Sequence, residues 1–423
     1  MTLPRQFLKG LAWAGYLIAI FCTLLGKDVY ADDTDWLKGF NDLNQTGVDL
    51  ARQGYFYVNG QYYRDEDGTY MSGQQYVEYQ IPKEVKHPYL VVMIHGGSQT
   101  AANWMTTLDG DEGWRSFFLA NGYIVYLVDQ VGRGRSPAYN PLGSYTPTEV
   151  VTYGMPYVTS AAAEVREVQW SIPEQFMLWP NADLHTQWPG FGTPGAGEPG
   201  DPVFDEFFAS QIQSRLDPPG IDSQRDAQNA GAALLDKIGP AILITHSQSG
   251  AHGFLISDAR PDLVKGVITL EGGGIFKDYT AVGAPNWYED GGRRGSPWGV
   301  TRAPITYAPA VNDPTELTIV QDSVADPGKL VRCWLQDPAA PGGVRQMPNL
   351  QKMSHLLVVG EASDRANHNH CVANYLTQAG VDNTWVNLAD VGIHGNGHML
   401  IVETNALQIA AYVASWLIEN VEN

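Results

Sequence analysis

One stretch of the sequence decides the fold: Ala241-Ile242-Leu243-Ile244-Thr245-His246-Ser247-Gln248-Ser249-Gly250-Ala251. It starts as an apolar run and continues into a serine that has small residues two positions to either side. A strand, a tight turn and a helix in this order hold a serine with its hydroxyl exposed, because small neighbours let backbone segments approach closely. Thr245 and Ser249 replace the glycines usual at those positions, and an ordinary strand–turn–helix is the alternative. Ser247 is the candidate nucleophile.

Short apolar runs flank this stretch on both sides and predict strands buried on both faces, at residues 90–94, 124–128, 241–244, 267–270 and 356–359. Helix-length segments separate them, at residues 112–120, 222–237 and 405–419. This alternation predicts an α/β fold with a mostly parallel central sheet flanked by helices. Near the start, Asn59-Gly60 between the strand-like residues 55–58 and 61–63 predicts a hairpin.

Two stretches interrupt the alternation, at about residues 137–221 and 272–350, and both are rich in Gly and Pro. Connections of this length in a compact domain are usually functional insertions, such as lids or caps, although plain surface loops are the alternative for any one of their residues.

The sequence His95-Gly96-Gly97-Ser98 directly follows the apolar run at 90–94. Acyl transfer builds negative charge on an oxygen, and backbone N–H groups aimed at that oxygen stabilise the charge. We therefore expect one such donor from Gly97 or Ser98 and the other from Gln248, the residue after the candidate nucleophile. His95 is expected to anchor the loop and not to act as a base.

The base and the acid follow later in the chain. His394 and His398 both lie between the strand-like residues 384–388 and the last helix, where the histidine of such a site belongs. We favour His398 because it lies at the helix entrance. Glu271 and Asp364 each follow a predicted strand, and either carboxylate could orient the imidazole.

These blocks together resemble a small group of secreted bacterial α/β-hydrolase esterases. In that group the turn that carries the nucleophile, called the elbow, reads Thr-His-Ser-Gln-Ser-Gly, as residues 245–250 do here. The similarity extends over most of the chain from about Gly54, the two insertions excepted, and includes residues 76–82, 94–96, 129–136 and 394–399. In that family the acid is a glutamate after the sixth strand. The resemblance therefore implies an α/β-hydrolase fold with Ser247, His398 and Glu271 as catalytic residues.

The N-terminus has the anatomy of a secretory signal peptide over residues 1–31. Arg5 and Lys9 precede an apolar run, and Val29-Tyr30-Ala31 offers small residues at a cleavage spacing. A mature domain from Asp32 to residue 423, secreted or periplasmic and without a membrane anchor, is expected, with an uncleaved anchor as the alternative.

Composition limits the partners. The formal net charge is −20, from 26 Lys+Arg against 46 Asp+Glu, which argues against nucleic acid and anionic lipid and weakly favours a neutral or apolar substrate. Cys333 and Cys371 remain after signal cleavage, and in an oxidising compartment they either pair or stay buried thiols. The sequence leaves open whether the protein forms a homodimer.

The sequence therefore predicts a serine esterase that acts on small carboxylic esters through an acyl-enzyme intermediate. An amidase, a peptidase or a larger-ester hydrolase with the same residues is the first alternative, and a non-catalytic binding module on this fold is the second. No cofactor or metal is expected, since His368-Asn369-His370 lacks further ligands and is interpreted as a surface turn.

Overall fold

The computed structural model describes residues 47–64, 68–137, 158–215, 222–273, 295–323 and 330–423. The predicted signal peptide and the predicted mature N-terminus at Asp32 lie outside these residues. Within the described ranges, no helix combines the length and the apolar character that crossing a bilayer requires.

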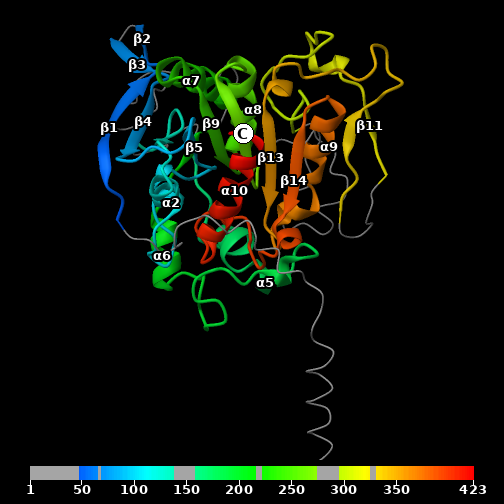
Figure 1. Cartoon of the computed structure of the whole chain (residues 1–423). Coiled ribbons are helices and arrows are strands. Elements are labelled where there is room, and N and C mark those ends of the chain that lie inside the picture. The colour runs from blue at the N-terminus through cyan, green and yellow to red at the C-terminus, as the bar shows by residue number, and fades with distance from the viewer. Residues whose placement is uncertain (1–46, 65–67, 138–157, 216–221, 274–294, 324–329) are drawn as a thin grey trace, which may run out of the picture.

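An eight-stranded sheet forms the centre of the molecule (Figure 1). In spatial order its strands are β1 (Leu50–Val58), β4 (Gln75–Pro82), β6 (Val125–Val128), β5 (Leu90–Ile94), β9 (Ala241–His246), β10 (Val264–Leu270), β13 (Ser354–Val359) and β14 (Asn383–Asn387). Neighbours from β6 to β14 run parallel, whereas β4 is antiparallel to both β1 and β6. The predicted mostly parallel sheet is confirmed, and each apolar run overlaps one of these strands.

Helices cover both faces of the sheet, with α2 (Trp114–Ala120) and α10 (Ala406–Asn420) on one face and α7 (Ser223–Ile238) and α8 (Ser249–Ala259) on the other. Successive side chains of a strand point to opposite faces. In β5, Val91 and Met93 accordingly pack in the core with α2 and α10, while Val92 and Ile94 pack with α7 and α8. Burial on both faces explains why the strands read as continuous apolar runs.

The predicted hairpin across Asn59-Gly60 is wrong. β1 pairs with β4 in the register Tyr55↔Glu78, and the short β2 (Gln61–Arg64) pairs with β3 (Thr69–Ser72). Stacking of Tyr55 on Tyr76, at a ring-centroid distance of 5.4 Å, favours the β1–β4 pairing. Asn59 does adopt the left-handed backbone expected there, with φ of 64°, but its side-chain amide donates to the carbonyl of Gly73 and caps the junction between two sheets.

The described part of the first long stretch, residues 158–215, is a chain of short elements: β7 (Val158–Thr159), α4 (Ala163–Arg166), the π-helical turn η3 (Glu167–Ser171), α5 (Pro173–Phe176), η4 (Ala182–Leu184), α6 (Pro202–Ala209) and β8 (Ser214–Arg215). α5 and α6 lie at the lower end of the molecule in Figure 1. The indole N–H of Trp179 donates to Ala362, and the amide of Thr186 donates to Gly395. This segment therefore covers the loops that follow β13 and β14.

The second long stretch contributes a two-stranded sheet of β11 (Ile319–Gln321) and β12 (Trp334–Gln336). Cys333, next to β12, forms a disulfide with Cys371 in α9 (His370–Gln378), with an Sγ–Sγ distance of 2.08 Å. Of the two states left open by the sequence, the structure shows the disulfide. It joins the second stretch covalently to a helix of the central domain.

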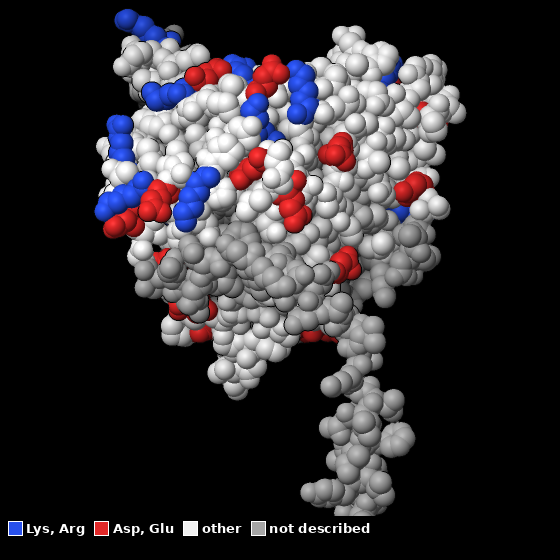
Figure 2. All heavy atoms as spheres, in the orientation of Figure 1, with Lys and Arg blue, Asp and Glu red and all other residues white. Residues whose placement is uncertain are grey.

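Charged side chains of both signs are interspersed on the face seen in Figure 2, where blue and red groups lie side by side along its left-hand part. Exposed pairs among the described residues include Lys83 with Asp49 and Lys352 with Asp262, at 2.8 and 3.0 Å. Exposed pairs of this kind contribute little to stability, so the acidic balance mainly favours solubility.

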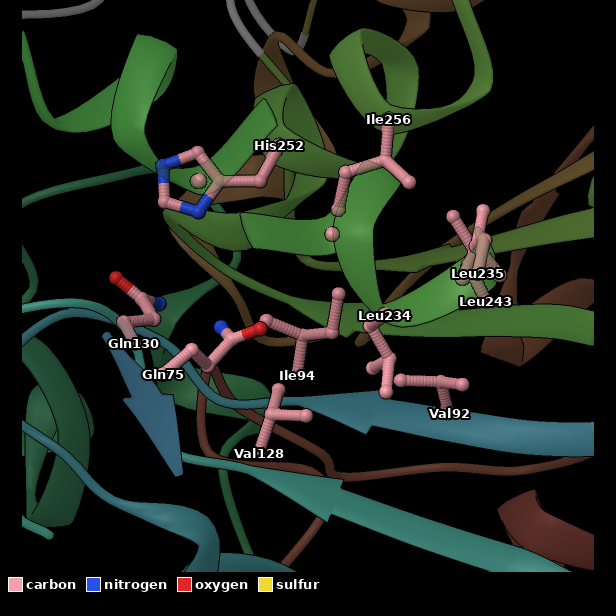
Figure 3. A pocket seen from close by; sticks show the side chains of 12 residues that line it. Gln75, Val92, Ile94, Val128, Gln130, Leu234, Leu235, Leu243, His252 and Ile256 are labelled. Carbon is pink, nitrogen blue, oxygen red and sulfur yellow. The ribbon is translucent and has the colours of Figure 1, made fainter. Parts of the chain in front are cut away.

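A small cavity lies between the sheet and helices α7 and α8 (Figure 3). Its volume is about 10 Å³, and Val92, Ile94, Leu234 and Ile256 line it. That volume holds about one water molecule. The cavity is too small for an organic substrate and is a packing feature of the core.

Candidate active site

Ser247 lies at the sharp turn between β9 and α8, with a backbone φ of 56°. A non-glycine residue in this left-handed region is strained, and such strain is common where a side chain is held in place for chemistry. The turn also demands a glycine three residues later, because a Cβ on Gly250 would lie 2.2 Å from the amide nitrogen of Gly273. The predicted strand–turn–helix is confirmed.

The two departures from the usual elbow have separate structural roles. The hydroxyl of Thr245 donates to the carbonyl of Ile268 at 2.9 Å. Its methyl group packs against Gly253, where an added Cβ would be only 3.0 Å from it. The hydroxyl of Ser249 is fully buried and bonds to the carbonyl of Ile94 at 2.8 Å. Ser249 is thus a structural residue of the turn, and the serine that faces a base is Ser247.

Ser247, His398 and Glu271 form one chain of hydrogen bonds. The Oγ of Ser247 lies 2.9 Å from Nε2 of His398, and Nδ1 of His398 lies 3.0 Å from Oε2 of Glu271. Glu271 is fully buried and also accepts bonds from the amide of Gly360, at 2.5 Å, and from the hydroxyl of Ser363. The structure therefore brings together the three residues that the sequence and the resemblance singled out.

Asp364, the alternative acid, lies beside this chain of hydrogen bonds. The basic side chains paired with its carboxylate are Arg365 and His368, at 3.9 and 4.0 Å, and no hydrogen bond joins it to His398 in the described residues. Burial opposes ionisation of Asp364, but the positive charge of Arg365 and the hydrogen bond to His368 outweigh burial and lower its pKa. Asp364 therefore places a negative charge near the imidazole without orienting it.

The imidazole of His398 is buried and neutral. Burial, with help from the nearby charge of Arg365, lowers the pKa of His398 to about 3. Both of its hydrogen bonds are satisfied when Nδ1 carries the proton and donates to Glu271, which leaves Nε2 to accept from the hydroxyl of Ser247. That is the protonation state a general base needs. Burial also raises the pKa of Glu271 well above its ordinary value.

His246 fixes the backbone of the histidine loop, a role that sequence reasoning missed. Its Nε2 bonds to the carbonyl of His398 at 2.9 Å, and burial lowers its pKa to about 3, so the ring is neutral. The elbow thus carries the nucleophile on one residue and a support for the base on the residue before it.

A second support is a buried group of one imidazole and two carboxylates. His185 lies between Glu174 and Glu403, with nitrogen–oxygen distances of 3.0 and 3.2 Å. The side chain of Glu403 accepts the amide of Gly397 at 3.1 Å and the side-chain amide of Asn396 at 2.8 Å. The loop that carries His398 is therefore held from residues 158–215 as well as from the central domain.

The protein is expected to lose stability as pH rises from about 6.5 to 9, through His185. Burial lowers the pKa of His185, but hydrogen bonds to Glu174 and Glu403 outweigh it and raise the pKa to about 9. A raised folded-state pKa gives stability that is complete below the unfolded value of 6.5 and lost as pH passes about 9, here on the order of 3 kcal/mol. Melting temperature measured across this range checks it.

His185→Gln should remove the slope in this pH window, because glutamine does not titrate. His394→Gln is the matched control, since His394 pairs with Glu361 at the surface and should leave the wild-type slope in place. Equal slopes in wild type and His185→Gln would contradict the assignment.

The oxyanion loop lies against the elbow. A Cβ on Gly96 would be 3.0 Å from Cβ of Ser247, and one on Gly97 would be 3.8 Å from the side chain of Gln248. Gly97 and Gln248 therefore lie next to each other beside the nucleophile. The amide of Ser98 instead donates to the hydroxyl of Ser214 at 3.0 Å, which narrows the expected donors to Gly97 and Gln248.

His95 anchors this loop, as expected. It is fully buried, its Nε2 accepts the amide of Gln130 at 3.0 Å and its Nδ1 bonds to the carbonyl of Gly96 at 2.8 Å. Burial lowers its pKa to about 4, so the ring is a neutral support of the loop.

The other histidines considered in the sequence have separate partners. His394 is more than half exposed and pairs with Glu361 at 3.2 Å, so it does not enter the site. The interpretation of residues 368–370 as a surface turn is wrong: His368 is buried, and His370 bonds to the carbonyl of Val331. The disulfide partner Cys371 follows directly, and packing around it buries this turn.

Trp170 forms a wall of the site that the sequence did not indicate. Its indole stacks on the imidazole of His398, with ring centroids 5.9 Å apart and an interplanar angle of 19°. Trp170 belongs to η3, in the first long stretch. Residues 158–215 therefore contact the reacting groups.

Two groups in the described residues have the composition of a metal site. Ligand atoms of Glu271, Asp364 and His398 lie within 4.8 Å of one another, and so do those of Cys333, His370 and Cys371. In the first group Nδ1 of His398 is already bonded to Glu271, and in the second the two sulfurs are joined in a disulfide. Both groups are therefore accounted for by bonds within the chain.

The chain is similar to known proteins over most of its length. It is 40% identical over 369 residues to the probable secreted lipase phiG of Fungal sp. (strain ATCC 74256), a match that spans 86% of this chain and 88% of that protein. Among solved structures, a bacterial esterase superposes with a TM-score of 0.58 at 21% identity, covering 90% of this chain and 99% of that one. At that identity the structural likeness supports the fold alone. No protein-family model matches.

Proposed function

Since the chain belongs to the α/β-hydrolase family of esterases and lipases that includes the fungal protein, we propose that it hydrolyses carboxylic esters with Ser247 as the nucleophile. One observation carries the proposal: the hydrogen-bonded series from Ser247 through His398 to Glu271, at 2.9 and 3.0 Å. A serine, an imidazole and a carboxylate in this order recur on unrelated folds wherever an acyl group is transferred.

The proposed reaction starts when Ser247 attacks the ester carbonyl and His398 takes its proton at Nε2. The tetrahedral oxyanion accepts hydrogen bonds from the amides of Gly97 and Gln248, each contributing roughly 3 kcal/mol. His398 then protonates the leaving alcohol, and an acyl-enzyme on Ser247 remains. Water, deprotonated by His398, releases the acid in a second round.

The carboxylate of Glu271 has two parts in this scheme. It holds the imidazole in the tautomer that accepts at Nε2, and its charge stabilises the imidazolium that forms during attack. Burial raises the pKa of Glu271 and lowers that of His398, because it disfavours each charge alone. When His398 takes up the proton of Ser247, its positive charge and the negative charge of Glu271 stabilise each other.

Two finer assignments are also proposals. The elbow at residues 245–250 supports membership of the subgroup that carries a glutamate acid after the sixth strand. The charged start, the apolar run and Val29-Tyr30-Ala31 support export, with a mature N-terminus at Asp32, and the fungal relative is named as a probable secreted protein.

Chromogenic esters test the activity. Nitrophenyl esters of two to twelve carbons, assayed beside a nitroanilide with the same acyl group, should give ester turnover that exceeds amide turnover by orders of magnitude. Faster cleavage of the anilide would identify an amidase or peptidase on the same residues. No turnover of any ester by folded protein would support a binding module instead.

A further inference from the structure

Arg166 is a buried guanidinium at the edge of the candidate site. It lies at the end of α4, where η3 begins, and only 7% of the residue is exposed. Its Nη2 donates to the hydroxyl of Ser98 at 2.7 Å, and Nη1 reaches Oε1 of Gln169 at 3.5 Å. A guanidinium carries five N–H donors, and the buried Nε has no hydrogen-bond partner in the described residues. Among the described residues, most of the N–H donors of this side chain therefore have no acceptor.

No carboxylate pairs with Arg166 within the part of the chain that the structure describes. Arg135 is different, since Glu78 and Asp129 bind it at 2.7 and 2.8 Å. Burial lowers the pKa of Arg166 to about 10, so it stays charged at neutral pH. A buried charge without a counterion is costly, and buried charges are normally paired. An anion that arrives with a ligand would complete this arrangement.

The position of Arg166 relates it to the reaction. Its guanidinium carbon lies 3.8 Å from the ring centroid of Trp170, and the same indole stacks on the imidazole of His398 with ring centroids 5.9 Å apart. The cation and the base are therefore within about 10 Å of each other. Its partner Ser98 follows Gly97, the candidate oxyanion donor. A guanidinium over an aromatic face can still donate from its edges, and Nε and the second N–H groups of Nη1 and Nη2 are the donors that a planar, two-pronged partner would use.

We propose that Arg166 binds a carboxylate group of the substrate, so that the ester to be hydrolysed carries a free carboxylate within about 10 Å of the scissile bond. The inference rests on the proposed function and names the substrate class for that site. A carboxylate matches one guanidinium in both charge and geometry. A phosphate dianion carries a second negative charge, which one guanidinium does not neutralise. The proposal differs from the weak sequence-based expectation of a neutral or apolar substrate, and the experiment below decides between them.

Paired substrates separate recognition of the carboxylate from general damage to the site. Nitrophenyl half-esters of succinate, glutarate and adipate carry the charge on the acyl side, and 4-acetoxybenzoate carries it on the alcohol side. Each is compared with its neutral methyl ester. In wild type, kcat/KM should favour the charged member of at least one pair, and the favoured series identifies the half of the substrate that Arg166 contacts.

Arg166→Gln should lower that charged-to-neutral ratio by roughly 30-fold, as expected for loss of one partner of a buried charge pair. Arg166→Lys should restore part of the ratio, because the cation is kept without the two-pronged geometry. The matched control is Arg133→Gln: Arg133 is also buried and donates to Gly96 of the oxyanion loop. An equal fall of the ratio in the control, or an unchanged ratio in Arg166→Gln, would overturn the proposal.

Binding without turnover distinguishes this inference from the proposed function. Glutarate should raise the melting temperature of wild type and not that of Arg166→Gln, whether or not any ester is cleaved. Ester turnover with no effect of glutarate and no charged-to-neutral preference would leave the esterase standing and remove the role of Arg166. A larger shift with inorganic phosphate than with glutarate would refute a carboxylate ligand.

Discussion

Ser247→Ala is expected to lose roughly 10⁶-fold in ester turnover while remaining folded. The hydroxyl is the only group in the proposed scheme that forms a covalent bond to the acyl carbon, and no other side chain in the described site can replace it. Ser249 is next closest in sequence, but its hydroxyl is buried and bonded to the carbonyl of Ile94. Steady-state kinetics with a nitrophenyl ester, at equal concentrations of folded protein, measure the loss.

Covalent labelling makes the same test independent of substrate choice. A fluorophosphonate should modify wild type at Ser247 and leave Ser247→Ala unlabelled. Ser249→Ala is the matched control, since it removes the neighbouring hydroxyl and should keep the label. A modified Ser249 found by peptide mass spectrometry would overturn the assignment of the nucleophile.

Glu271→Gln is expected to lose about 10⁴-fold in kcat, because an amide in place of the carboxylate favours the wrong imidazole tautomer and leaves the imidazolium uncompensated. Gln is close in volume to Glu, and its carbonyl oxygen at the Oε1 position can still accept from the amide of Gly360. Its NH2 group then replaces Oε2, where it faces the hydroxyl of Ser363, which can accept as well as donate. The variant should therefore fold, which near-ultraviolet circular dichroism checks.

Asp364→Asn is the companion variant, since both residues follow adjacent strands and both lie close to His398. Its loss should be far smaller, because Asp364 makes no hydrogen bond to His398 in the described residues and contributes only a nearby charge. The reverse ranking of the two losses would assign the acid to Asp364, as the sequence alone allowed.

Much of the central architecture follows from local pattern. The strands of the parallel sheet are buried on both faces, so their apolar runs stand out without any alignment, and the small residues around Ser247 mark the turn. The hairpin at Asn59-Gly60 failed because turn residues report a local backbone shape and not the partner strand, which aromatic contacts between β1 and β4 help to determine.

The supports of the site could not be read in the same way. Trp170, Arg166 and His185 lie in an irregular stretch whose short elements have no period to detect. In the fold Trp170 contacts His398, Arg166 contacts Trp170, and His185 bonds to Glu403, which holds the His398 loop. The pairing of His185 with Glu403 spans 218 residues of sequence. Contacts of that separation between unlike residues carry no sequence signal of their own, whereas the spacing of a turn does.

Thr245 shows that the room an elbow needs can be supplied from elsewhere in the chain. Its side chain occupies a position where glycine is usual, and the compensating glycine, Gly253, lies on the neighbouring helix α8. The two positions therefore form one steric unit. A sequence motif for such proteins should therefore treat positions 245 and 253 together, and allow a residue larger than glycine at position 245 only when position 253 is glycine. A compensating double substitution, Thr245→Gly with Gly253→Ala, would exchange the sizes of the two residues and bring this turn closer to the common motif.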